Sequence, residues 1–203
     1  MNEHRIGYVL NADTLGCTAG CRMDQSNNPC FGEMVCISAQ NAQTIYGIIS
    51  NVHILDDGLI RQLATIQVID EQVIRDNRDN RIVPLEFSII FLGFCQAEQI
   101  HHLLPPNPPL SLESVFACPR EEILTFTNAG SSGYMRYMVS EKTMLNFDLI
   151  AAHFRNLHSL LAEQDRRAWV EKATQTLVHS YRNDYDTLSA LLRTLSDATI
   201  FNA

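Results

Sequence analysis

The stretch PLEFSIIFLGFC, residues 84–95, is the clearest guide to the fold of this chain. Apolar and polar residues alternate from Leu85 to Ser88, and the residues that follow are almost continuously apolar. Alternation is typical of a strand with one buried face, whereas a continuous apolar run fits a strand covered on both faces. We therefore expect a strand over residues 84–95 that is covered on both faces at one end.

Other short runs rich in Ile, Val and Tyr lie on both sides of this stretch and predict further strands. They cover residues 5–10, 33–39, 44–55, 63–74, 114–117 and 134–139, with loops expected at 16–29 and 130–133 and a turn of helix at 120–126. Several short strands separated by turns must hide their edges, which a closed or nearly closed sheet achieves. We expect a small antiparallel β-barrel.

The spacing of apolar residues changes to steps of three and four from about residue 146 onward, which predicts helices. We place Asn146 as a helix N-cap, and we place Gln164 and Asp165 between two helices. The expected fold class is therefore α+β, with an antiparallel barrel domain over residues 1–140 and a C-terminal helical tail over residues 141–203.

The last apolar series of the tail fits the a and d positions of a coiled coil over about two and a half heptads. It consists of Val178, Tyr181, Tyr185, Leu188, Leu192 and Leu195. Two interpretations stay open: the helix packs on its own domain, or the stripe pairs with another chain and gives a homo-oligomer. Because an apolar stripe of this length is rarely left in water, its residues from Tyr181 to Leu195 are candidates for an interface.

Length and charge exclude several classes of function. The chain has 203 residues, 46% of them hydrophobic, and a formal net charge of -8, which suits one or two globular domains. The acidic balance argues against broad affinity for nucleic acid, and no lysine precedes Lys142. Direct binding of single-stranded nucleic acid, by stacking of its bases on aromatic residues of the β-strands, stays an alternative, although we expect that nucleic acid is not the partner. These aromatic residues are Tyr8, Phe31, Tyr46 and Phe87.

Familiar catalytic motifs are absent from the sequence. It has no Gly-Lys pair and so no phosphate-binding P-loop, and it has no Gly-x-Gly-x-x-Gly, Gly-x-Ser-x-Gly or His-Glu-x-x-His pattern. We therefore expect no cofactor and no enzymatic activity. An enzyme with a site that no motif reveals stays an alternative.

Four of the six cysteines lie between Cys17 and Cys36. Only Cys17 and Cys21 have a spacing that suits zinc, and Cys36 lies in an apolar strand, where a thiol behaves as a small hydrophobe. We expect free thiols and no bound metal; zinc, or a disulfide within residues 17–30, stay open. The N-terminus lacks the pattern of a secretory signal, and no apolar run is long enough to span a membrane, so we expect a cytoplasmic protein.

Several segments, taken in order, resemble the HAS-barrel, the amino-terminal barrel of HerA-type DNA translocases. They are Ile6-Gly-Tyr-Val9, Phe31-Gly-Glu-Met-Val-Cys-Ile37, Tyr46-Gly-Ile-Ile49, Ile89-Ile-Phe-Leu-Gly93 and the proline segment Pro105-Pro-Asn-Pro-Pro109. Two departures stand out: Leu110 replaces the glycine that follows the family's prolines, and the ATPase core with its P-loop lysine is replaced by the helical tail.

The resemblance implies a non-catalytic adaptor or assembly module. In that family the barrels form a ring on a hexameric motor and receive partners, including the nuclease NurA. A barrel without the motor is therefore expected to bind a HerA-like ATPase ring or a nuclease in DNA processing. The candidate interface residues are Pro105, Pro106, Pro108 and Pro109, together with Tyr181, Tyr185, Leu188, Leu192 and Leu195.

Overall fold

The structure, a computed structural model, describes residues 4–22, 28–40, 42–54, 58, 65, 71–72, 84–130, 132–139 and 147–198. Its strands are β1 (Arg5–Ala12), β2 (Gly16–Arg22), β3 (Met34–Ala39), β4 (Gln43–Ile54), β5 (Pro84–Gln96), β6 (Gln99–His101) and β7 (Ser114–Ala117). Its helices are α3 (Arg120–Asn128), the 3-10 helix η1 (Gly133–Tyr137), α4 (Phe147–Leu160), α5 (Glu163–Ser180) and α6 (Tyr185–Asp197). Apart from residues 65 and 71–72, the expected strand at 63–74 lies outside the described residues, as does the expected N-cap Asn146.

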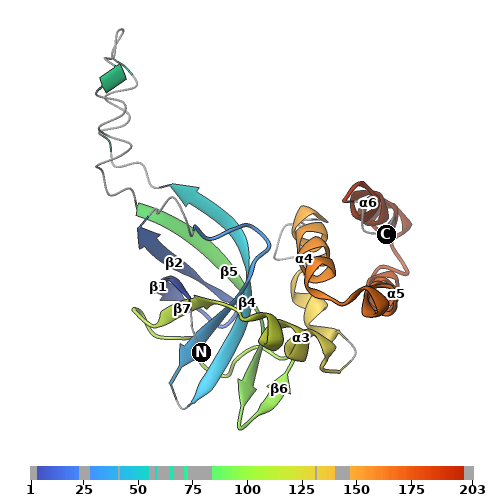
Figure 1. Ribbon diagram of the computed structural model, residues 1–203, viewed down its shortest axis with the longest axis horizontal. Helices are drawn as coiled ribbons and strands as arrows, with labels where there is room; N and C mark the ends of the chain where they lie inside the picture. Colours follow the sequence, from blue (N-terminus) through green and yellow to red (C-terminus); the bar gives the residue numbers. More distant parts are fainter. Residues whose placement is uncertain are drawn as a thin grey trace.

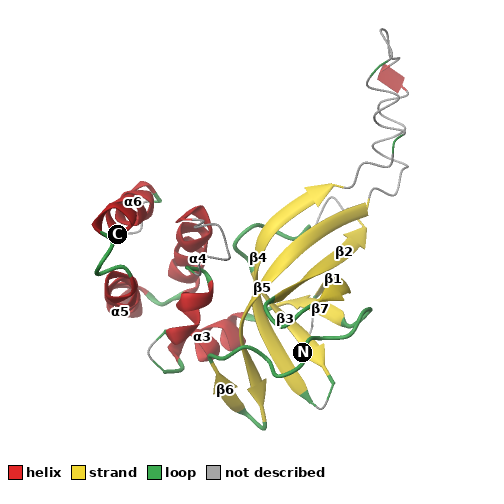
Figure 2. Ribbon diagram, turned by 180° about the vertical axis from the view of Figure 1, so that it is seen from behind, coloured by secondary structure: helices red, strands yellow, loops and turns green. Residues whose placement is uncertain are grey.

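Six strands close into an antiparallel barrel in the order β1, β7, β3, β4, β5, β2, and β2 pairs again with β1. The helices gather on one side of this barrel (Figures 1 and 2). The fold class expected from the sequence, α+β with a small barrel followed by helices, is confirmed. The stretch at 84–95 is the long strand β5, which pairs with β2, β4 and β6.

The barrel has an apolar core on each side of its wall. The interior is filled by side chains such as Ile37, Phe87 and Phe91, all fully buried. Outside the wall, Ile48 and Leu92 pack against the helices in a second core. This arrangement confirms the two-faced covering expected near the end of β5, because Phe91 faces the interior and Leu92 faces the helices.

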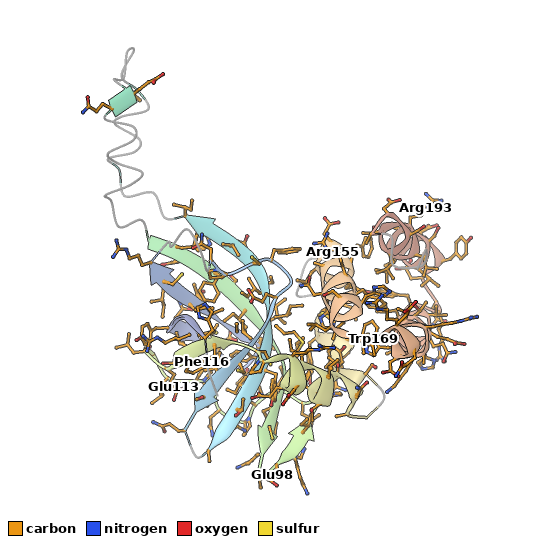
Figure 3. The ribbon with its side chains drawn as sticks, in the orientation of Figure 1. Glu98, Glu113, Phe116, Arg155, Trp169 and Arg193 are labelled. Atoms are coloured by element: carbon orange, nitrogen blue, oxygen red, sulfur yellow. The ribbon has the colours of Figure 1, made fainter. Side chains whose placement is uncertain are left out.

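A continuous series of ring contacts joins the barrel to the helices. Tyr46 on β4 lies 4.6 Å from Phe126 on α3, and Phe126 lies 5.4 Å from Tyr134 on η1, measured between ring centroids. Tyr134 contacts His153 on α4, which in turn contacts Trp169 on α5. Trp169 is labelled in Figure 3. Aromatic pairs at such distances add to the free energy of burial. The second core therefore spans both sequence segments, 1–140 and 141–203.

Gly32 shows how closely the barrel approaches α4. Its φ is +79°, and a Cβ at this position would lie 2.5 Å from the Cβ of Ala152. The Asn156 side chain on the same helix donates a hydrogen bond to the Gly32 carbonyl at 2.9 Å. Only glycine meets both demands, because it has no Cβ and tolerates positive φ.

The loop expected at 16–29 is wrong in its first part, which forms strand β2. Its sequence, GCTAGCR, has one β-branched residue, Thr18, and no aromatic residue, so it gives little of the signal that marks a strand. The small residues are required by close packing, since a Cβ on Gly16 would lie 2.2 Å from the Ile89 carbonyl oxygen. This strand closes the barrel.

The strand expected at 134–139 is also wrong, because residues Gly133–Tyr137 form the 3-10 helix η1. Ser132 has a left-handed φ of 58° that turns the chain before the helix. The helix buries Tyr134, Met135 and then Met138 in the second core. Closely spaced bulky apolar residues predicted a strand, but in the observed conformation Tyr134, Met135 and Met138 all reach the same core.

The heptad series of the tail is not carried by one helix. α5 ends at Ser180 and α6 begins at Tyr185, and the Asp184 carboxylate caps α6 by accepting from the Thr187 N–H at 3.1 Å. The continuous coiled-coil stripe is therefore wrong. The expected break at Gln164 is wrong as well, because it lies in the first turn of α5 and the chain leaves α4 at Leu160.

Candidate functional site

The proline segment connects β6 to β7 on the barrel. Pro105 and Pro109 are buried, whereas Pro106 and Pro108 are exposed. The two outer prolines therefore fix the segment to the barrel, and the two inner prolines face solvent. Because proline restricts φ, this exposed backbone loses little conformational entropy when a partner binds.

Leu110 and Leu112 follow the prolines and are exposed, as is Leu10 on the neighbouring strand β1; we call these three residues the leucine rim. The exposed fractions of Leu10, Leu110 and Leu112 are 40%, 52% and 73%. Backbone hydrogen bonds hold them to one part of the barrel wall, because the Leu112 N–H donates to the Val9 carbonyl at 2.7 Å. The Ser111 hydroxyl also donates to the Leu10 carbonyl at 3.1 Å.

Leu112 has an unusual backbone conformation. Its φ of 69° is left-handed, which costs a residue with a Cβ about 1–2 kcal/mol. Its neighbour Glu113 fixes this turn, because the Glu113 carboxylate accepts from the Leu110 N–H at 3.1 Å. Glu113 lies on the side of the barrel away from the helices (Figure 3). A large apolar side chain is thus held in water in a strained turn.

The tail residues do not join this surface. Leu195 is fully buried in the second core, Leu188 and Leu192 are partly buried, and Tyr185 is 79% exposed. Tyr181 lies in the turn before α6 and packs against the same core. Since α6 lies beyond α4, on the far side of the helices from the barrel, the two groups of expected interface residues are on opposite sides of the molecule (Figure 1).

The strand aromatics do not form a platform for bases. Phe87 is fully buried in the barrel interior, and Tyr46 is 5% exposed beneath α3. Tyr8 and Phe31 are on the surface at 38% and 37% exposure. Stacking with bases needs exposed ring faces, so half of the expected set is unable to take part.

A cavity of about 590 Å³ lies between the barrel, α3 and α4. Its titratable lining residues are His4, Cys30, Glu33 and Cys118. Burial raises the pKa of the Glu33 carboxyl, and the Cys30 N–H donates to this carboxyl at 3.1 Å. The Glu33 carboxylate therefore accepts from a backbone N–H and not from a nucleophilic side chain, so this contact is not a pair of nucleophile and general base.

The cysteines from Cys17 to Cys36 do not gather in one place. Cys17 faces the barrel interior, where burial raises its pKa to about 12, and Cys36 faces the second core on the other side of the wall. Cys36 instead meets Cys118 and Glu122. Sequence spacing gave no sign of this cluster, because strand pairing between β3 and β7 creates it.

No family model matches the chain, and the search of curated proteins also finds no match. Within the described residues, the structure has no helix with both the length and the apolar character needed to cross a bilayer.

Proposed function

We propose that the protein is a non-catalytic, cytoplasmic barrel adaptor that binds a protein partner through its leucine rim. The observation that supports this most directly is Leu112, which is 73% exposed at a left-handed φ of 69°. Such strain persists only where surrounding structure enforces it, and it is concentrated at functional sites. The exposed Pro106 and Pro108 extend the same surface with a stiff backbone.

The resemblance to the HAS-barrel supplies the class of partner, a HerA-like ATPase ring or a nuclease that acts with it. The barrel interior is filled with apolar side chains, so recognition must use the outer wall or the rim. An apolar, uncharged rim suits another protein surface better than a phosphate backbone, which requires clustered cations.

The test is binding between the purified protein and a purified HerA-type hexamer from the same genome, followed by sedimentation and by surface plasmon resonance. We expect Leu112→Asp to weaken binding at least about 10-fold, because it places a charge in the centre of an apolar contact. Ile54→Asp is the matched control, since Ile54 is 55% exposed at the end of β4 and lies outside the rim.

Equal binding by wild type and Leu112→Asp would refute the rim as the interface. Failure of the wild-type protein to bind either the hexamer or its nuclease would refute the partner class. Tight, salt-sensitive binding to oligonucleotides by the wild-type protein would favour the nucleic-acid alternative instead.

A further inference from the structure

Three side chains with metal-binding atoms meet between the barrel wall and α3. Cys36 lies on β3, Cys118 follows β7, and Glu122 lies in the first turn of α3. Both Sγ atoms and one carboxylate oxygen lie within 4.8 Å of one another, and within the described residues this is the only such group of three or more His, Cys, Asp and Glu side chains. Cys36 is opposite Phe116 in the β3–β7 ladder, so positions 36 and 118 project from the same face.

The spacing of these atoms is close to that of a tetrahedral zinc site. With Zn–S bonds of about 2.3 Å, two thiolates on one tetrahedral ion lie about 3.8 Å apart. Atoms that lie within 4.8 Å of one another therefore need to move by about 1 Å or less. Rotation of the Glu122 side chain and small changes in the two cysteine rotamers are enough, and the backbone can stay in place.

The donor set selects the kind of ion. Thiolates are soft ligands that favour zinc and disfavour magnesium and calcium, and a carboxylate is an accepted third ligand of zinc. Two thiolates and one carboxylate around Zn²⁺ leave a net charge of about -1. The fourth position is then filled by water, as in zinc sites with three protein ligands.

Tyr46 completes the arrangement outside the three ligands. Its hydroxyl donates to Oε2 of Glu122 at 3.3 Å, and the Phe126 ring packs against the Tyr46 ring. Hydrogen bonds of this kind orient carboxylate ligands and strengthen metal binding. Cys118 also lines the cavity of about 590 Å³ beside α3, which gives an ion a route to the cluster.

We propose that Cys36, Cys118 and Glu122 bind one Zn²⁺ ion and that Tyr46 is the positioning residue of the site. The ion would fasten β3, β7 and α3 together where the barrel meets the helices. Zinc therefore adds stability at this contact, since a metal that binds only the native state favours that state. This site is independent of the leucine rim.

The protonation of the thiols gives the site a defined pH dependence. Zinc is held by cysteine thiolates and not by neutral thiols, so binding of the ion releases protons. Its affinity is therefore expected to fall as the pH is lowered.

The experiment uses the full chain, reduced, freed of metal with a chelator and kept under anaerobic conditions. Zn²⁺ is added and measured per chain after gel filtration, and Co²⁺ is used in parallel because its spectrum reports thiolate ligands and tetrahedral geometry. We expect one equivalent of Zn²⁺ and a cobalt–thiolate charge-transfer band. The band should fall to about half in Cys118→Ser, because one of the two thiolates is lost.

Cys95→Ser is the matched control. Burial and then the nearby Glu122 carboxylate raise the pKa of Cys95, yet Cys95 lies outside the three-residue cluster. This variant should bind zinc as the wild type does. Tyr46→Phe should weaken zinc about 10- to 100-fold and shrink the zinc-induced rise in Tm, while the melting curve in excess chelator stays near that of the wild type.

Wild-type protein that retains less than about a tenth of an equivalent of Zn²⁺, or a cobalt spectrum unchanged in Cys118→Ser, would overturn the proposal. It would also be overturned if Cys36 and Cys118 formed a disulfide in the purified chain and took up no zinc after reduction. Because the wild-type spectrum alone decides whether thiolates bind metal, the test stands even if a cysteine variant fails to fold.

Discussion

Burial of His153 is expected to lower the stability of the protein at acidic pH, and a single substitution at this residue tests that effect. The side chain is 1% exposed on α4, and its Nε2 atom and the Tyr134 hydroxyl are joined by a hydrogen bond of 3.0 Å. Within the described residues its Nδ1 atom has no hydrogen-bond partner. Burial lowers the pKa of His153 from 6.5 to about 3, because a charged imidazole loses its hydration there.

The direction of the effect follows from the two protonation states. Above about pH 6.5 the imidazole is neutral in both the native and the unfolded protein and costs nothing. Between about pH 6.5 and 3 the His153 imidazole is protonated in the unfolded chain and neutral in the native protein, so the free energy of unfolding falls as the pH falls. The maximum slope is about 1.4 kcal/mol per pH unit, and the loss between about pH 7.5 and 5 is about 2 kcal/mol.

The assay is urea unfolding at a series of pH values, followed by the fluorescence of the single tryptophan, Trp169, which packs against His153. His153→Gln removes the titration and keeps an amide near the Tyr134 hydroxyl. The wild type should lose about 2 kcal/mol more than this variant on acidification to about pH 5.

Tyr134→Phe is the control that separates burial from hydrogen bonding. It removes the hydroxyl but leaves His153 buried, so the acid sensitivity should persist. Parallel stability curves for the wild type and His153→Gln over this pH range would refute the reasoning. So would NMR shifts showing that His153 is protonated in the native protein at about pH 5.

Three further outcomes follow from side-chain packing and from backbone strain. Leu195→Ala should destabilise the protein by about 2–5 kcal/mol in urea unfolding, whereas Tyr185→Ala on the exposed face of α6 should change stability by less than about 0.5 kcal/mol; similar values would contradict the packing of α6. Gly32→Ala should cost about 1–3 kcal/mol more than Gly58→Ala, since both have φ of +79° but only Gly32 faces Ala152; equal costs would argue against that contact. Leu112→Gly should keep the Tm of the wild type or raise it while partner binding weakens, and a lower Tm would argue against strain at this residue.

The periodicity of the sequence was enough for the general architecture. The change from alternation to steps of three and four separated the barrel from the helices. The two-faced pattern of residues 84–95 also revealed that one strand lies between two apolar layers. These signals are local, because each residue records which side of its own element is buried. β2 and η1 were not predicted, because the small residues of β2 and the closely spaced bulky residues of η1 do not show the period of a strand or of a helix.

Contacts between distant segments were decided only by the tertiary structure. The tail series left open whether it packs on its own domain or pairs with another chain, and the turn at Tyr181 lets α6 fold back and bury Leu195 against its own core. Cys36 and Cys118 came together because β3 pairs with β7, and Glu122 joined them because α3 starts beside that pair. Sequence determines the environment that each residue prefers, whereas strand pairing and helix packing determine which residues share that environment.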